Sequence, residues 1–95
     1  MPIEIRHVPQ KSRFETTVEG ALGVAEYRLE DGAMLLTHTE VAPRLRGRGI
    51  AGQLVQAALD HAQVSGLAVR PICAYARRYV ERRDGTADAS RMREA

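Results

Sequence analysis

The sequence predicts a small mixed α/β domain: antiparallel N-terminal strands, a glycine-rich loop, a crossover helix, a parallel strand and a short C-terminal helix. Three observations support this class. Apolar and polar residues alternate over the N-terminal part, the apolar spacing becomes helical after Ile50, and Gly47 and Gly49 lie at the change. The 95 residues allow one domain, which we expect at 1–83 with a polar tail at 84–95.

The N-terminal part is expected to form four strands that are neighbours in the chain. Apolar and polar residues alternate at 3–6 and 14–18, and residues 20–29 fit a strand better than a short helix. Ala33 to Val41 forms a further strand, and Asp31-Gly32 before it can take the positive φ of a tight hairpin turn. Strands this close in sequence are expected to pair antiparallel.

A helix follows the glycine loop. Apolar residues recur at helical spacing from Ile50 to Ala62, and Ser65-Gly66 ends the run, which predicts a helix from about Gly47 to Val64. This length suits the crossover between two parallel strands. The second of these strands is expected at Leu67–Cys73.

The end of the predicted domain is a strand followed by a short helix. Pro71 makes the far end of the Leu67–Cys73 strand an edge or a point of departure from the sheet. Residues 75–83 can form a helix with Tyr75 and Tyr79 on one side.

Composition excludes several classes of protein. Apolar residues make up 44% and charged residues 27%, a globular balance. No apolar run is long enough to cross a bilayer and no signal segment opens the chain, so we expect a cytoplasmic protein without membrane contact. A single cysteine, Cys73, excludes an internal disulfide, and Cys73 and the histidines lack metal-ligand spacing, so no metal is expected.

The net charge of +2 is unevenly distributed. Residues 1–43 carry a balance of −3, whereas residues 44–95 carry +5, and almost all the basic side chains are arginine. Arginine suits phosphate, so an anionic partner on the C-terminal half is one interpretation and a solvated basic surface is the other. Scarce aromatic residues argue against stacking on single-stranded nucleic acid.

The loop before the helix predicts a phosphate site. Small residues at Gly47, Gly49 and Ala51 let the backbone approach a ligand closely, and the free amides and dipole of the helix start favour an anion. No Gly-Lys-Ser/Thr follows, which excludes a Walker loop, and the glycine spacing does not fit a dinucleotide fingerprint.

The segment Arg46-Gly47-Arg48-Gly49-Ile50-Ala51 resembles the signature Arg/Gln-x-x-Gly-x-Gly/Ala of the GNAT superfamily of acetyl-CoA-dependent N-acyltransferases. Within that superfamily, the sequence resembles the minimal single-domain group. The likeness includes His38-Thr39-Glu40-Val41 before the loop and Pro71-x-Cys73-x-Tyr75 after the next strand, and it covers roughly residues 13 to 82. The resemblance implies a truncated GNAT fold.

The resemblance also implies a co-substrate, acetyl-CoA, and transfer of its acetyl group to an amine of unknown identity. In this superfamily the central strand and its successor splay apart. The pantetheine arm lies in that wedge, and the loop amides hold the pyrophosphate. Carried over to this chain, the residues that bind the coenzyme are Thr39, Val41, Arg46, Gly47, Arg48, Gly49, Ile50 and Ala51.

Cys73 and Tyr79 are candidates for the chemistry. A Cys73 thiolate near the thioester could take the acetyl group covalently; otherwise the residue is a small buried hydrophobe. Tyr79 could protonate the departing CoA thiolate, as a tyrosine at this place does in many members, with Tyr75 as a second candidate. The alternative for Tyr79 is packing with its hydroxyl at the rim.

A base is also required, because an amine near neutral pH is protonated and cannot attack a thioester. His38 and Glu40 are expected to share a strand face with Leu36 by alternation, and either can relay the proton. The alternative for His38 is a core histidine satisfied by a backbone partner.

Two classes of function are compatible with the sequence. The first is the N-acetyltransferase, and the second is a non-catalytic module that binds CoA or nucleic acid through its basic half. Ordinary members carry extra elements that wall the acceptor site, and this chain has no sequence left for them. A partner protein, the acceptor itself or a second copy is therefore expected to supply the walls.

Overall fold

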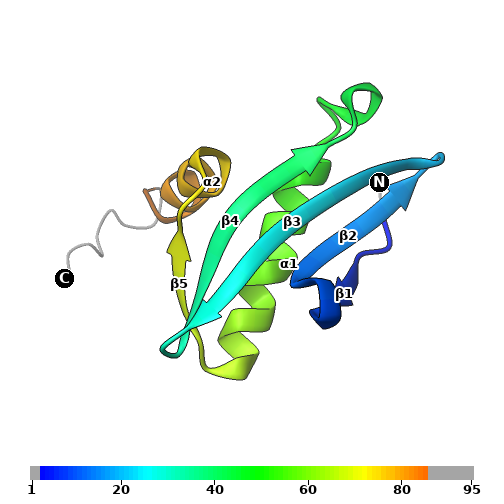
Figure 1. The fold of residues 1–95 in the computed structure, drawn as a ribbon. Coiled ribbons are helices and arrows are strands. Elements are labelled where there is room, and N and C mark those ends of the chain that lie inside the picture. Colours follow the sequence, from blue (N-terminus) through cyan, green and yellow to red (C-terminus); the bar gives the residue numbers. More distant parts are fainter. Residues whose placement is uncertain (1–2, 86–95) are drawn as a thin grey trace.

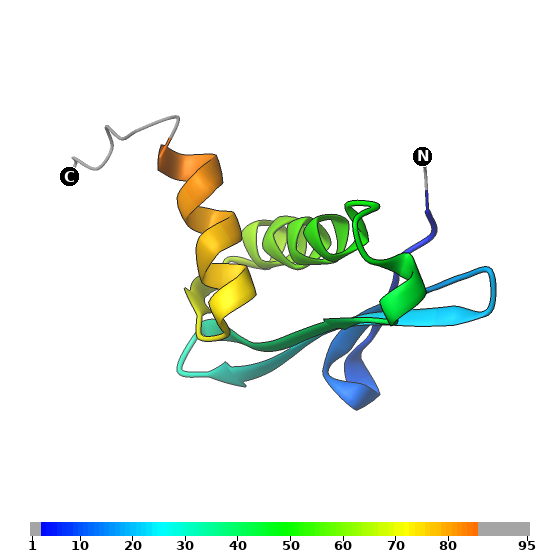
Figure 2. The ribbon, with the colours of Figure 1, turned by 90° about the horizontal axis from the view of Figure 1, so that it is seen from above.

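The computed structural model describes residues 3–85, which form a five-stranded sheet with two helices on one side of it (Figures 1 and 2). The elements are β1 (Arg6–Val8), β2 (Arg13–Val18), β3 (Ala21–Glu30), β4 (Ala33–Val41), α1 (Ile50–Ser65), β5 (Ala68–Pro71) and α2 (Ala74–Gly85), with 3₁₀ turns at Pro9–Lys11 and Pro43–Leu45. The strands lie in chain order. Neighbours from β1 to β4 are antiparallel, and β4 and β5 are parallel. The predicted fold class is confirmed.

Two tight turns join the long strands. Asp31 and Gly32 between β3 and β4 both have positive φ, at 50° and 77°, so the predicted hairpin turn is confirmed. Glu19 and Gly20 between β2 and β3 adopt the same conformation, at 52° and 79°. Both turns suit the right-handed twist of the strands that they connect.

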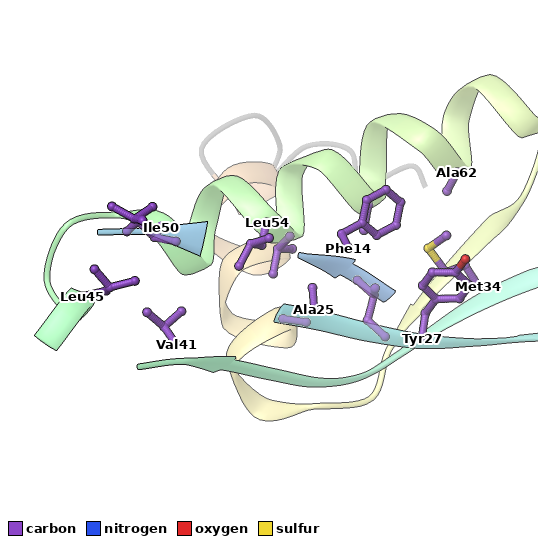
Figure 3. Close-up of a cluster of buried hydrophobic side chains, with 14 of the residues drawn as sticks. Phe14, Ala25, Tyr27, Met34, Val41, Leu45, Ile50, Leu54 and Ala62 are labelled. Atoms are coloured by element: carbon purple, nitrogen blue, oxygen red, sulfur yellow. The ribbon is translucent and has the colours of Figure 1, made fainter. Parts of the chain in front are cut away.

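The core lies between α1 and the sheet (Figure 3). Leu54 and Val55 of α1 are fully buried, and burying such side chains stabilises the fold by roughly 1.5–3 kcal/mol each. A Cβ at Gly23 of β3 would lie 3.2 Å from Cδ1 of Leu54. The absence of a side chain at Gly23 therefore lets the helix lie close to the middle of the sheet.

The first strand is displaced from its predicted position. It pairs with β2 through Arg6–Val8 rather than through residues 3–6, because the His7 ring stacks on Phe14 with centroids 4.3 Å apart. Ile3 and Ile5 still pack against the core as partly buried side chains. The alternation of Ile3 and Ile5 with polar residues therefore predicts correctly that these two side chains are partly buried, but it predicts the wrong residues for the paired strand.

Both helices differ from their predicted bounds. Gly47 and Gly49 have φ of 82° and 76°, which an α-helix does not allow, so α1 begins at Ile50 rather than at Gly47. Helix α2 extends one residue further back and two further forward than the predicted 75–83. The rest of the predicted tail, residues 86–95, lies outside the described residues. Within residues 3–85, neither helix is long and apolar enough to span a membrane.

A bulge in β4 changes which residues share a face. The register between β3 and β4 shifts at Thr37, whose hydroxyl donates to the carbonyl of Glu26 at 3.3 Å. Leu36 is buried in the core under α1, whereas His38 and Glu40 beyond the bulge lie exposed on the opposite face. The expectation that all three residues share one face is therefore wrong for Leu36.

An aromatic cluster ties β1 to the far end of α1. Nε2 of His7 and the Tyr27 hydroxyl share a 2.6 Å hydrogen bond, and the His61 ring lies 4.4 Å from the His7 ring. Burial, and secondarily the charge of His61, lower the pKa of His7. Burial raises the pKa of Tyr27, so its hydroxyl stays protonated.

Acid is expected to destabilise the fold through His7. The pKa of His7 in the fold lies below its ordinary 6.5, so the unfolded chain binds more protons as the pH drops through this interval. Stability from the neutral imidazole is present above pH 6.5 and is lost as the pH falls. We expect the melting temperature of a His7→Gln protein to fall less than that of the wild type between about pH 7.5 and about pH 5. Equal falls in the two proteins would contradict this prediction.

Candidate functional site

Strand β5 leaves β4 part-way along its length. Their pairing ends at Leu36 opposite Pro71, and the Leu36 carbonyl accepts hydrogen bonds from the amides of Ile72 at 2.9 Å and Cys73 at 3.0 Å. The chain then turns into α2, while β4 continues to Val41, so the two strands diverge (Figure 1). Beyond Leu36, β4 has no partner strand on this side in the described part of the chain.

The exposed edge of β4 presents backbone groups to this opening. The Ala42 amide donates to the Leu22 carbonyl of β3 at 3.0 Å. Backbone hydrogen bonds alternate in direction along an antiparallel strand. Thr39 and Val41 therefore turn their N–H and C=O groups away from β3, toward the side that β5 has left. An extended ligand with amide groups can pair with them.

The glycine loop adds a second set of free amides. The N-cap of α1 is Gly49, which has no side chain to cap the helix, and residues 47–52 donate no amide hydrogen bond within the described chain. A Cβ at Gly47 or Gly49 would find no atom within 4 Å. The loop is thus open at the positions where an anion would meet the positive end of the helix dipole.

A cavity of about 730 Å³ connects the edge of β4 with this loop. Its volume lies in the range typical of ligand sites. It is lined by His38, Thr39, Glu40, Val41, Leu45, Arg46, Gly47, Gly49, Ile50, Ala51 and Tyr75.

The three arginines of the loop have different partners. Arg44 donates to the backbone carbonyl of Glu19, and Arg48 forms a 3.4 Å ion pair with the Glu19 carboxylate, so both fasten the loop to the β2–β3 turn. Arg46 lines the cavity and forms no ion pair or side-chain hydrogen bond with any described residue. Its guanidinium is available to a ligand, whereas phosphate binding by Arg48 stays a prediction.

Cys73 lies at the closed end of the opening and caps α2. Its carbonyl accepts from the Arg77 amide at 3.0 Å, and its Sγ accepts from the Ala76 amide at 3.3 Å. The Sγ also lies 3.5 Å from Oγ1 of Thr39 on β4. The thiol therefore contacts the lining of the cavity and has a structural role at the start of the helix.

The two tyrosines of α2 stack with centroids 6.5 Å apart but differ in their surroundings. Tyr75 lines the cavity. Tyr79 lies against α1, where its hydroxyl donates to Oε1 of Gln56 at 2.8 Å. Of the two tyrosines that the sequence offers, Tyr75 is thus the one whose surroundings suit contact with a ligand.

His38 and Glu40 lie on the face of the sheet that the helices leave bare, with Nε2 of His38 3.1 Å from Oε1 of Glu40 (Figure 2). Their side chains are 54% and 68% exposed, so the alternative of a core histidine is wrong. Both residues also line the cavity along the edge of β4. Glu40 extends into a second hollow, of about 420 Å³, whose lining includes Leu22, Val24 and Glu26 on the bare face.

The structure brings most of the predicted site residues together. Nine of them line one cavity: His38, Thr39, Glu40, Val41, Arg46, Gly47, Gly49, Ile50 and Ala51. Cys73 contacts this set through Thr39, whereas Arg48 and Tyr79 have partners elsewhere. Sequence reasoning missed Leu45, a fully buried apolar residue between two arginines. No group of three or more potential metal ligands occurs among residues 3–85.

Comparison with known proteins agrees with this geometry. The family of GCN5-related N-acetyl-transferases matches residues 13–89. The chain belongs to this family. The resemblance inferred from the loop and its flanking residues is therefore confirmed.

Vertebrate relatives match this chain in sequence, and a solved bacterial structure matches it in fold. Protein NATD1 of Mus musculus is 37% identical over 87 residues, covering 84% of this chain and 76% of the relative. Protein NATD1 of Homo sapiens is 36% identical, covering 84% and 74%. The solution structure of a GCN5-like protein from Staphylococcus aureus superposes with a TM-score of 0.70 at 26% identity, covering 90% of this chain and 85% of that one.

Proposed function

We propose that this protein binds acetyl-CoA in the 730 Å³ cavity and transfers the acetyl group to an amine. One observation carries the proposal: the free edge of β4, the open loop amides and the Arg46 guanidinium, which has no partner among residues 3–85, meet in a single cavity. Family membership supports acetyl transfer as the reaction class.

The residues present fit the coenzyme. The free amides of residues 47–51 and the helix dipole suit a pyrophosphate, and Arg46 adds a charge-assisted contact. The backbone groups of Thr39 and Val41 suit the amides of a pantetheine arm. Cys73 and Thr39 close the opening where β4 and β5 meet, which sets the depth that an acyl group can reach.

Acetyl-CoA supplies the acyl group in activated form, as a thioester. In this proposal the amine loses one proton as its nitrogen bonds to the acyl carbon, and either His38 or Glu40, both of which line the cavity, accepts it. We assign to the Tyr75 hydroxyl, which lines the cavity, the donation of a proton to the sulfur, which keeps the electron pair of the broken carbon–sulfur bond. Tyr79, the first candidate for that role, supports Tyr75 by stacking on it.

The acceptor is proposed to approach from the bare face of the sheet. Glu40 lines both the cavity and the second hollow on that face, so a group held there reaches the open edge of β4 directly. No helix among residues 3–85 covers this face (Figure 2). The acceptor, a partner protein or a second copy of this chain would then supply the missing wall.

Gly49→Ala is expected to weaken CoA binding at least about tenfold, because the added methyl group meets the ligand at the loop amides. Gly32→Ala is a matched control: Gly49 and Gly32 have φ of 76° and 77°, and neither has an atom near a Cβ. Because an alanine is strained at either φ, both changes should lower the melting temperature by a similar amount. Only Gly49→Ala should change the affinity for CoA in calorimetric titration. Equal affinities in the two folded proteins would refute the loop site.

Removing the charge of Arg46 and removing that of Arg48 should have unequal effects on CoA binding. Arg46→Ala removes a direct contact with the phosphates and should weaken CoA binding by about ten- to a hundredfold. Arg48→Ala removes the same charge from a side chain held by Glu19 and should weaken it no more than about threefold. Similar losses in both variants would show that the loop acts through general charge instead.

Cys73 is expected to be structural rather than a nucleophile. Cys73→Ser retains an acceptor for the Ala76 amide, so this protein should remain folded and keep most of its activity. Cys73→Ala loses the cap, at a cost of about 0.5–1 kcal/mol, and should stay substantially active below its melting temperature. Two inactive but folded variants, with an acetyl adduct on the wild-type chain in intact-mass spectrometry, would instead establish a covalent acetyl-cysteine.

A further inference from the structure

Gly52 lies where α2 crosses α1, directly beneath the tyrosine stack. A Cβ at Gly52 would lie 3.3 Å from Cε1 of Tyr79 and 3.4 Å from the hydroxyl oxygen of Tyr75. The contact with Tyr79 is tighter than ordinary packing and the one with Tyr75 lies at the limit of ordinary contact, so a side chain here would displace the Tyr79 ring, which stacks on Tyr75, by a few tenths of an ångström. The missing side chain therefore determines how closely the two tyrosines approach α1.

The conformation of Gly52 does not require glycine. It lies inside α1 and is not among the glycines with positive φ, unlike Gly47 and Gly49 in the loop before it. Glycine inside a helix costs roughly 0.5–1 kcal/mol relative to alanine. What the position does require is space for the rings of α2.

Gln56 of α1 also contacts Tyr79, through a hydrogen bond. It lies one helical turn after Gly52, and its Oε1 accepts the hydrogen bond of the Tyr79 hydroxyl at 2.8 Å. The Tyr79 ring in turn stacks against Tyr75. The Tyr75 hydroxyl forms no hydrogen bond with the described residues, and Tyr75 lines the cavity.

We propose that Gly52 and Gln56 are positioning residues that hold the Tyr75 hydroxyl at the cavity, Gly52 by leaving room and Gln56 by fixing Tyr79. The inference rests on the proposed function, in which Tyr75 donates a proton to the sulfur as the carbon–sulfur bond breaks. Rate is sensitive to displacements of this size, because proton transfer needs the donor within hydrogen-bond reach.

A double-mutant cycle between Gly52 and Tyr75 tests the proposal. Gly52→Ala should lower kcat for acetyl transfer about fivefold or more, with KM for acetyl-CoA and the Kd of CoA changed less than about threefold. Tyr75→Phe should lower kcat at least as much. Adding Gly52→Ala to Tyr75→Phe should cause no further loss, because Gly52 acts only through the missing hydroxyl.

Gln56 gives an independent test that does not alter the helix backbone. Gln56→Leu removes the acceptor for Tyr79 and should lower kcat. The Nε2 group of Gln56 also donates to Asp60 at 2.8 Å, so the conservative variant is the double replacement of Gln56→Glu with Asp60→Asn, which keeps an acceptor for Tyr79 without two facing carboxylates and should restore most of kcat. Gln63→Leu, the same replacement at an exposed position of α1, is the control and should leave kcat unchanged.

The outcomes separate this inference from the proposed function. A wild-type protein that binds no CoA would overturn both. If the wild type binds CoA and transfers acetyl groups, the inference alone is overturned by Gly52→Ala with wild-type kcat. It is equally overturned by a Gly52→Ala loss that persists in the Tyr75→Phe background, or by a Gln56→Glu, Asp60→Asn protein that is no better than Gln56→Leu.

Discussion

The cavity depends on one backbone carbonyl, that of Leu36, which accepts hydrogen bonds from two successive amides. The Leu36 carbonyl takes hydrogen bonds from both Ile72 and Cys73, which ends the pairing of β5 with β4 and turns the chain into α2. Had β5 continued along β4, it would have used the backbone groups of Thr39 and Val41. The same departure places Cys73 at the closed end of the opening and brings Tyr75 to its side.

The glycine loop and residues of both helices form the rest of the cavity wall. Arg44 and Arg48 hold the loop on Glu19, so Gly47 and Gly49 present their amides without a side chain in the way. Anions are favoured there because α1 starts without a side-chain cap. On the opposite face no helix among residues 3–85 covers the sheet, so the face from which we propose that the acceptor approaches is open.

Features set by local chemistry could be predicted from the sequence, and features set by tertiary partners could not. The strand Ala33–Val41 and the Asp31-Gly32 turn follow from alternation and from positive φ, and both are observed as predicted. The bulge at Thr37 is invisible to alternation, and it reverses the face of every later residue in β4. Which arginine and which tyrosine point into the cavity depends on Glu19 and Gln56, which are distant in sequence.

The most direct test of the central claim is to follow the backbone amide resonances of the labelled protein by NMR during titration with CoA. The structure predicts the largest shifts at residues 47–51 of the loop and helix start, and at Thr39 and Val41 on the free edge of β4. Saturable shifts confined to those two segments would support a coenzyme site built from one strand edge and one loop. Shifts gathered instead around His7 and His61, or no shifts at saturating CoA, would contradict it.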